Sequence, residues 1–407
     1  MLLVRSEWHR LIVILLAICF WIVWNYWASL FFYASIWLYD LRVSDFSIFY
    51  IVGSLWSSRV NPYVAWGYRF VYPPTSLPFF GMFALFNFEF AARLWTVMYM
   101  SLFVLAWVAL ALTLKRERRY LFISLAVLLF FTSFSFLRLL ELSQIDMLVT
   151  SLTILSLVSQ RMKRNLLSAA ILSLGTLLKG SAIFFLIYFV VFRRDLKYLA
   201  YFLACALVTV GVSLVIVPVQ WYWYWIVNVV PTMYSQFGLQ DSQSIVSLLW
   251  LAGFGKSALQ VVSLFGLGLL TIFALYTGSN RWIKTTRGST IRADAMFLIN
   301  GLVVLLLSPF SLIYPYVWVI LPLALFLSAL LMEKPKLWYL ALVVFAAFLL
   351  NSSPYGFTGE PFRFVFVSIS FPTATIGSLI LSISLIPLYV RPAAVLSWRQ
   401  RRNKRIG

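Results

Sequence analysis

Long apolar segments without charge follow one another along almost the whole 407-residue chain, and this pattern limits the possible folds more than any other feature. Hydrophobic residues make up 63% of the chain and charged residues 11%, against roughly 45–50% and 25% in soluble domains. Strands of a membrane barrel alternate apolar and polar residues, whereas these segments are apolar on all sides. The sequence therefore predicts an all-α polytopic membrane protein. It excludes a soluble domain, a disordered chain and a disulfide-stapled module.

Basic residues outnumber acidic ones by 32 to 12, which gives a formal net charge of +20. In a soluble protein this charge would suggest nucleic acid, but cytoplasmic loops of membrane proteins also carry an excess of Lys and Arg. If all the basic clusters are cytoplasmic, an even number of crossings must separate each from the next. A bundle of about twelve transmembrane segments meets this condition, with both termini inside and a basic tail at 391–407. The expected segments are 11–36, 92–114, 121–137, 147–160, 166–178, 181–192, 198–217, 259–279, 294–308, 316–332, 337–351 and 369–390.

The stretch 166–192 is interrupted by a single charge, Lys179. As one span it would place one of its flanking basic clusters outside, whereas two short segments keep both inside. Each short segment covers only about 20 Å, less than the roughly 30 Å of the hydrocarbon core. We therefore expect a re-entrant hairpin or two short spans, with Lys179 and Gly180 at a tight turn below the outer surface.

Two long loops are expected on the outer face, at 36–91 and 218–258, within a single membrane domain covering 1–407. In the first loop, apolar residues after Asp45 recur at helical spacing, which predicts an amphipathic helix lying in the membrane interface. These residues are Phe46, Phe49, Tyr50, Gly53 and Trp56. Loops of this length are uncommon unless they are functional, and an acid at membrane depth tends to be functional.

Histidine occurs once, at His9, on the side expected to be cytoplasmic. A Ser/His or Cys/His nucleophile and a His-based metal site are therefore excluded from the outer face. The sequence has no P-loop and no Gly-rich dinucleotide fingerprint, so a nucleotide-driven pump or a dinucleotide-dependent enzyme is not expected. What remains is carboxylate chemistry at the outer face, with Arg and Lys available for an anion.

Three groups of residues follow one another in the first loop: Asp45-Phe46 with Tyr50, then Asn61-Pro62-Tyr63, then 70–74. Their order resembles the first-loop signature of glycosyltransferase family 87, whose best-known members are polyprenol-phosphate-mannose-dependent mannosyltransferases. Shorter motifs similar to those of the family follow in the same order at 143–146, 177–179 and 308–311.

The resemblance implies a GT-C-type fold, a multispan helical bundle whose first outer loop forms interfacial helices. It also implies a hexosyltransferase, with mannose as the expected sugar, which uses a polyprenyl-phosphate donor. The acceptor is a hydroxyl group on a glycolipid, glycan or glycoprotein, and the anomeric configuration inverts. In this family a first-loop carboxylate acts as general base, and it maps onto Asp45. The leaving phosphate needs positive charge rather than a proton, which Arg or Lys can supply.

Asp45 is thus the predicted catalytic residue, with Asp40 and Asp146 as alternatives. The residues expected to bind the donor phosphate, the sugar or the acceptor are Arg42, Tyr50, Tyr63, Arg69, Tyr72, Gln144, Lys179, Gln243 and Tyr314, with Arg138 as a further candidate for the phosphate. Tyr314 stands where the family often has histidine, and the family's Asn-x-Ser element appears only as Ser242-Gln243-Ser244, so the sugar and the acceptor stay open. The motifs require no cofactor, although a divalent metal is not excluded.

Two other classes of function are considered beside the enzyme. A transporter or flippase of lipid-linked saccharides often shows inverted repeats and broken helices near the bilayer midplane, but no internal repeat is found and the polar residues gather at one face. A non-catalytic scaffold would not need an acid-bearing amphipathic loop. The sequence favours a multi-pass enzyme of the plasma membrane, with its active site on the extracytoplasmic face and no nucleic-acid partner.

Overall fold

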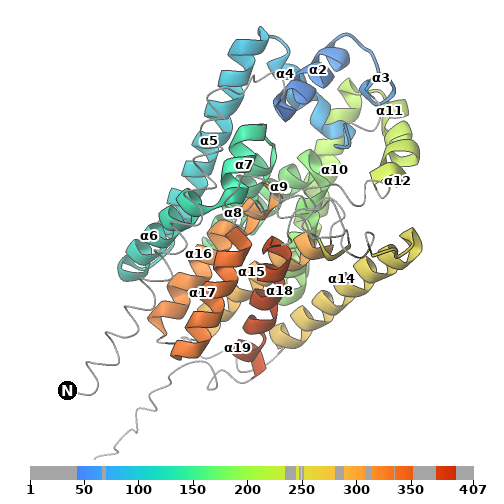
Figure 1. The fold of residues 1–407 in the computed structure, drawn as a ribbon. Coiled ribbons are helices and arrows are strands. Elements are labelled where there is room, and N and C mark those ends of the chain that lie inside the picture. Colours follow the sequence, from blue (N-terminus) through green and yellow to red (C-terminus); the bar gives the residue numbers. More distant parts are fainter. Residues whose placement is uncertain are drawn as a thin grey trace, which may run out of the picture.

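The structure, a computed structural model, describes residues 44–66, 70–233, 244–246, 249, 252–279, 288–307, 314–333, 335–351 and 373–390. The regular elements in these parts of the chain are helices, as the sequence predicts (Figure 1). Three of them are long and apolar enough to cross a membrane, and shorter apolar helices accompany them. The three are α5 (Phe88–Leu112), α10 (Leu196–Ile216) and α14 (Lys256–Ser279).

Each predicted segment from 92–114 onward overlaps at least one helix. The helices of the bundle, besides the three long ones, are α6 (Arg116–Thr132), α7 (Phe134–Leu142), α8 (Asp146–Arg161), α9 (Asn165–Leu178), η4 (Gly180–Phe185), η5 (Ile187–Phe192), α15 (Gly288–Leu307), η8 (Tyr314–Tyr316), α16 (Val317–Met332), α17 (Leu337–Asn351), α18 (Thr373–Leu385) and α19 (Pro387–Val390). The predicted first span, 11–36, and the basic tail, 391–407, lie outside the described residues.

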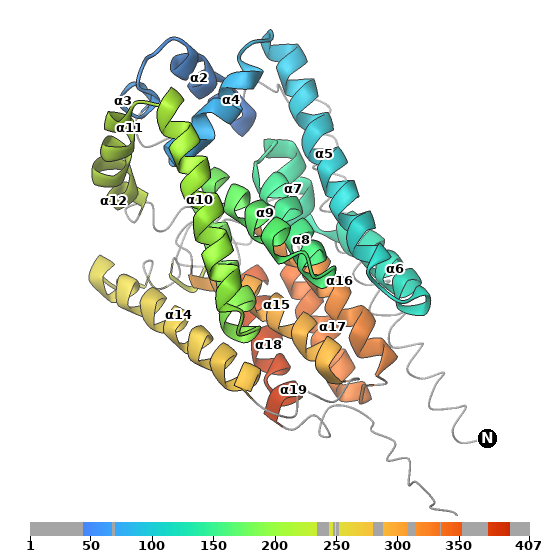
Figure 2. The same cartoon turned by 180° about the vertical axis from the view of Figure 1, so that it is seen from behind.

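Short helices from the two long loops lie together at one end of the molecule (Figures 1 and 2). They are α2 (Asp45–Ser57), α3 (Pro62–Ala65), η3 (Pro74–Ser76) and α4 (Leu77–Phe83) from the first loop, and α11 (Val219–Tyr224), η6 (Trp225–Val229) and α12 (Val230–Met233) from the second. Helices α8 and α16 lie inside the bundle, and nearly all of their residues are buried.

The helix predicted after Asp45 is confirmed as α2. Its buried side includes Phe46, Phe49 and Gly53, which are three of the positions that the helical spacing selects. Gly53 lies against the backbone of α4, because a Cβ at this position would be 2.5 Å from the carbonyl oxygen of Phe80. A larger residue would force the two helices apart. The first loop is thus a packed helical unit, and α2 carries Asp45 in its first turn.

The predicted break at Lys179 is also confirmed. Helix α9 ends at Leu178, Lys179 is extended with φ −147° and ψ 110°, and η4 begins at Gly180. The expected reason for the glycine is wrong, because Gly180 does not have a left-handed φ and a Cβ there would meet nothing within 4 Å. The turn therefore does not need a glycine, and Lys179 itself makes the bend.

A buried cluster of charges joins four helices at the opposite end of α8 from Lys179. The carboxylate of Asp294 on α15, which is 1% exposed, accepts hydrogen bonds from Arg118 on α6 and from Arg161 on α8. Arg118 also donates through Nε to the Ser328 hydroxyl on α16 at 3.1 Å. The positive-inside pattern predicts all four of these helix ends on the cytoplasmic side. Their contact supports that arrangement.

Substitution of Gly53 by alanine is predicted to destabilise the protein, because the new methyl group would collide with the α4 backbone. We expect a loss of about 1–3 kcal/mol of stability, measured as a lower thermal unfolding midpoint in detergent. Gly211→Ala in α10 is the matched control, since a Cβ there meets nothing within 4 Å. Equal midpoints for the two variants would contradict the close approach of α2 and α4.

Candidate functional site

A buried ion pair lies where the start of α8 and the end of α9 meet. The ammonium of Lys179 donates to both carboxylate oxygens of Asp146, at 2.8 and 2.7 Å. The indole N–H of Trp318, at the start of α16, donates to Oδ1 of the same carboxylate at 2.9 Å. The side chain of Asp146 is 0% exposed and that of Lys179 is 21% exposed. The carboxylate is thus enclosed by donors, while part of the lysine side chain remains open.

The local sequence explains why these two charges face each other. Asp146 lies in the first turn of α8, and Lys179 directly follows the last residue of α9. A carboxylate at a helix N-terminus and an ammonium at a helix C-terminus both complement the helix dipoles. The entry to α8 is fixed by Ser143, which has a left-handed φ of 52°, and by Trp95, whose indole donates to the Ser143 carbonyl at 2.9 Å.

The first loop reaches this ion pair directly. The ring of Tyr72 lies 5.9 Å from the Lys179 ammonium, and Thr75 donates to the Leu177 carbonyl at 2.6 Å. The second loop contributes as well, because Trp225 donates to the Val71 carbonyl at 3.0 Å. Segments from both long loops therefore meet next to Tyr72, whose ring lies against the lysine.

Gln144 precedes the ion pair by two residues and is 2% exposed. Its Oε1 is buried and has no hydrogen-bond partner among the described residues. Two hydroxyl groups are likewise buried without a hydrogen-bond partner among the described residues. They belong to Thr150, one turn along α8 from Asp146, and to Ser181, two residues after Lys179. Leaving a buried acceptor unsatisfied costs about 1–3 kcal/mol. These atoms therefore suit a site where water or a polar ligand supplies the missing partners.

The predicted base, Asp45, lies on a different part of the first loop. It is half-buried in the first turn of α2. Within the described residues the polar and aromatic contacts of Lys179 go to Asp146 and Tyr72, so Asp45 is outside the ion-pair cluster. The two parts are linked through α4, which packs on α2, and η3, which carries Thr75.

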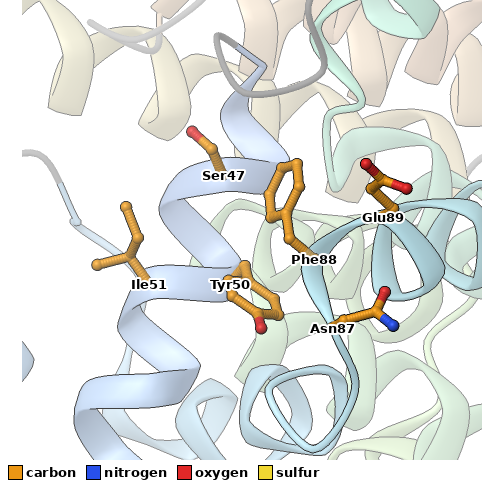
Figure 3. Close-up of a pocket in the computed structure, with 6 residues that line it drawn as sticks. All are labelled: Ser47, Tyr50, Ile51, Asn87, Phe88 and Glu89. Carbon is orange, nitrogen blue, oxygen red and sulfur yellow. The ribbon is translucent and has the colours of Figure 1, made fainter.

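A groove of about 540 Å³ opens between α2 and the start of α5 (Figure 3). Tyr50 lines it, and its hydroxyl donates to the Phe86 carbonyl at 2.8 Å. The carboxylate of Glu89 lies on its α5 side, in the first turn of that helix. Its lining residues are Ser47, Tyr50, Ile51, Asn87, Phe88 and Glu89. Asp45 is not among them, although it precedes Ser47 by two residues on the same helix.

The structure places the predicted site residues in different surroundings. Tyr72 and Lys179 are in contact, Gln144 is buried two residues before Asp146, and Tyr50 lines the separate groove. Tyr63 is fully buried within the first loop, where its hydroxyl donates to the Tyr72 carbonyl at 2.8 Å. The remaining candidates, Asp40, Arg42, Arg69 and Gln243 and the side chains of Arg138 and Tyr314, lie outside the described residues.

Two residues of these sites, Trp318 and Glu89, are not predicted from the sequence. Trp318 was not selected because a tryptophan at the edge of an apolar span is usually part of the interfacial aromatic belt. Glu89 was not selected although an acid at the edge of an apolar span is costly and would have been a usable signal. Within the described residues, no group of three or more His, Cys, Asp and Glu side chains is placed to hold a metal ion.

Comparison with known proteins shows the class of this chain. The family model of glycosyltransferase family 87 matches residues 70–309, more than half of the 407 residues. The chain therefore belongs to glycosyltransferase family 87 and is a transferase by that membership. The matched segment contains Tyr72, Asp146 and Lys179, whereas Asp45 and Trp318 lie outside it. No curated protein and no solved structure matches the chain.

The buried phenol of Tyr63 gives a prediction for alkaline pH. Burial raises its pKa well above the ordinary value, and the nearby Tyr222 raises it further. In the unfolded chain the phenol loses its proton near pH 10, whereas the folded protein keeps it neutral to higher pH. The stability contribution is therefore complete below about pH 10 and is lost as the pH rises above it.

We predict that Tyr63→Phe lowers stability by about 0.5–1.5 kcal/mol at pH 7, because the hydrogen bond to Tyr72 is lost. The decline of the thermal midpoint above about pH 10 should then be shallower than in the parent protein. Tyr120→Phe, at an exposed position, is the control. An unchanged alkaline profile in Tyr63→Phe would contradict this role.

Proposed function

We propose that this family 87 glycosyltransferase transfers a hexose, with mannose as the expected sugar, from a polyprenyl-phosphate donor to an acceptor hydroxyl. The observation that carries the proposal is the Lys179 side chain, which is 21% exposed and whose ammonium is held by the buried carboxylate of Asp146 beside Tyr72 of the first loop. Asp146 accepts two of the N–H groups of this ammonium, and a lipid phosphate at the membrane boundary is an anion that can accept the third.

The transfer is an in-line displacement with inversion at the anomeric carbon. Asp45 accepts the proton of the acceptor hydroxyl while the oxygen attacks the anomeric carbon. The bond between that carbon and the phosphate oxygen breaks, and its electron pair remains on the polyprenyl phosphate. The phosphate gains one negative charge in this step, so a fixed cation near it stabilises the transition state. Lys179 supplies that cation.

The enclosure of Asp146 supports Asp45, rather than Asp146, as the base. The carboxylate of Asp146 already accepts hydrogen bonds from Lys179 and Trp318 and is 0% exposed. An acceptor hydroxyl would have to displace these donors. Asp45 is half-buried at the start of α2, the helix that also carries Tyr50 of the groove. The buried Oε1 of Gln144 has no hydrogen-bond partner among the described residues and can accept a hydrogen bond from a sugar hydroxyl.

Two charge clusters at opposite ends of α8 support placing the reaction on the extracytoplasmic face of the plasma membrane. The Asp294 cluster joins helix ends that the basic residues predict to be cytoplasmic. Asp146 lies at the other end of α8, with both long loops beside it. The proposed partners are thus the bilayer, a polyprenyl-phosphate sugar and a glycolipid, glycan or glycoprotein acceptor.

Removal of the Asp45 carboxylate tests the base. Asp45→Asn and Asp45→Ala are predicted to lower turnover by about 10²–10⁴-fold, while binding of polyprenyl phosphate is kept. The assay follows transfer of radiolabelled mannose from polyprenyl-phosphate mannose to octyl α-mannoside and related alkyl hexosides by the purified full-length protein. Glu333→Gln, an acid at the far end of α16, is the control and should keep full activity.

Full activity in both Asp45 variants would show that another group is the base. Binding of the donor without turnover by the parent protein, coupled to movement of the lipid across vesicle membranes, would favour the transporter function instead.

Removal of the ammonium tests the phosphate contact. Lys179→Ala is predicted to raise the donor KM by about 10–100-fold, because one charge-assisted hydrogen bond to the phosphate is worth about 1.5–3 kcal/mol. Lys179→Arg, which keeps the charge, is the matched comparison and should retain more affinity. A donor KM that does not change in Lys179→Ala would remove the lysine from the phosphate site.

A further inference from the structure

We infer that Asp146 and Trp318 are positioning residues, which hold the Lys179 ammonium in the one orientation that serves the departing phosphate. The inference rests on the proposed function, since it concerns the same reaction. It adds two side chains that do not touch the substrate, and one of them, Trp318, lies outside the segment that the family model matches.

Three hydrogen bonds to the Asp146 carboxylate fix the ion pair, two from Lys179 and one from Trp318. Two N–H groups of the ammonium are directed at the two oxygens of Asp146, so its remaining N–H has a set direction. The indole N–H of Trp318 donates the third hydrogen bond, to Oδ1 of Asp146 at 2.9 Å, and so limits rotation of that carboxylate. Trp318 is itself 3% exposed and its ring lies 6.1 Å from that of Phe185 on η4. Packing therefore holds the tryptophan, and the tryptophan holds the carboxylate.

Without these contacts the lysine would not stay in place. A lysine side chain carries about 2 kcal/mol of rotamer entropy. Near a membrane surface its long stem lets the ammonium reach the polar boundary. The contacts with Asp146 oppose both effects, and Tyr72 covers the ammonium from the side of the first loop.

A purely structural role explains the arrangement less well. A buried ion pair adds little net stability, because removing two charges from water offsets most of their attraction. The burial here is also unequal, with Asp146 at 0% and Lys179 at 21% exposure. The carboxylate side chain is thus fully buried and the lysine side chain partly exposed, as expected where the cation meets an anionic ligand.

The charges predict where in catalysis the effect appears. The ammonium donates one hydrogen bond to the singly charged phosphodiester of the donor, and a small displacement of the ammonium changes this ground-state contact less than its complete removal does. During transfer the phosphate gains a second negative charge, and a fixed N–H donor stabilises that charge more than the ground state. Disturbing the position of the ammonium should therefore lower kcat more than it raises the donor KM.

The test uses the purified full-length protein, polyprenyl-phosphate mannose as donor and octyl α-mannoside as acceptor. Asp146→Asn keeps the shape of the side chain and loses its charge, while Trp318→Phe keeps an aromatic ring and loses the N–H. Both are expected to lower kcat by about 10–100-fold, since hydrogen bonds to charged groups are worth about 1.5–3 kcal/mol. The donor KM should change less than about threefold.

Two further variants keep the test independent of folding. Trp107→Phe is the matched control for Trp318→Phe, because the buried Trp107 indole N–H has no hydrogen-bond partner among the described residues. The double variant Asp146→Asn with Lys179→Met removes both charges and leaves no unpaired ion. It should fold, as judged by its thermal midpoint, and should bind radiolabelled polyprenyl phosphate less tightly than Asp146→Asn alone.

The outcomes separate this inference from the proposed function. If polyprenyl phosphate binds equally well to the double variant and to the parent protein, the phosphate role of Lys179 fails and the positioning role fails with it. If the double variant loses affinity but Asp146→Asn and Trp318→Phe behave like Trp107→Phe, only the positioning role fails. A rise in donor KM equal to the fall in kcat would also overturn it.

Discussion

The buried ion pair between Asp146 and Lys179 limits how four separate parts of the chain can pack. Two charges away from water are tolerated only when each finds the other in good geometry. This requirement holds the start of α8 against the end of α9, and Trp318 adds α16 to the same point. The first loop then closes on the lysine through Tyr72 and Thr75. One electrostatic contact thus gathers four separate parts of the chain.

The opposite end of α8 shows a different use of charge. There Asp294 binds two arginines, Arg118 and Arg161, and the cluster keeps one net positive charge. The cluster near Lys179 is neutral, and the lysine is its open member. The Asp294 cluster joins helix ends, whereas the cluster at Lys179 joins helix ends and also lies beside the first long loop. For this reason we propose that the donor phosphate binds at the Lys179 end of α8.

Local patterns in the sequence predicted part of this site well. The spacing of Phe46, Phe49 and Gly53 gave α2, and the isolated charge of Lys179 gave the break after α9. The partner of that lysine was not predicted, although Asp146 had been noted as an alternative base. The reason given for Gly180 was wrong, because a turn can form at an extended residue without any left-handed glycine. Trp318 was missed because an aromatic residue at the end of an apolar span has the same sequence appearance in a belt and in a site.

The sequence by itself determined the helices, the side of the membrane expected for each cluster and the chemical types available for catalysis. These properties follow from hydrophobic length and charge distribution, which are local along the chain. Only the tertiary structure decided which charges meet, because the partners of Asp146 lie 33 and 172 residues away. Contacts over such separations depend on how helices pack against one another. Helix packing brings Lys179 and Trp318 to the same buried carboxylate, that of Asp146.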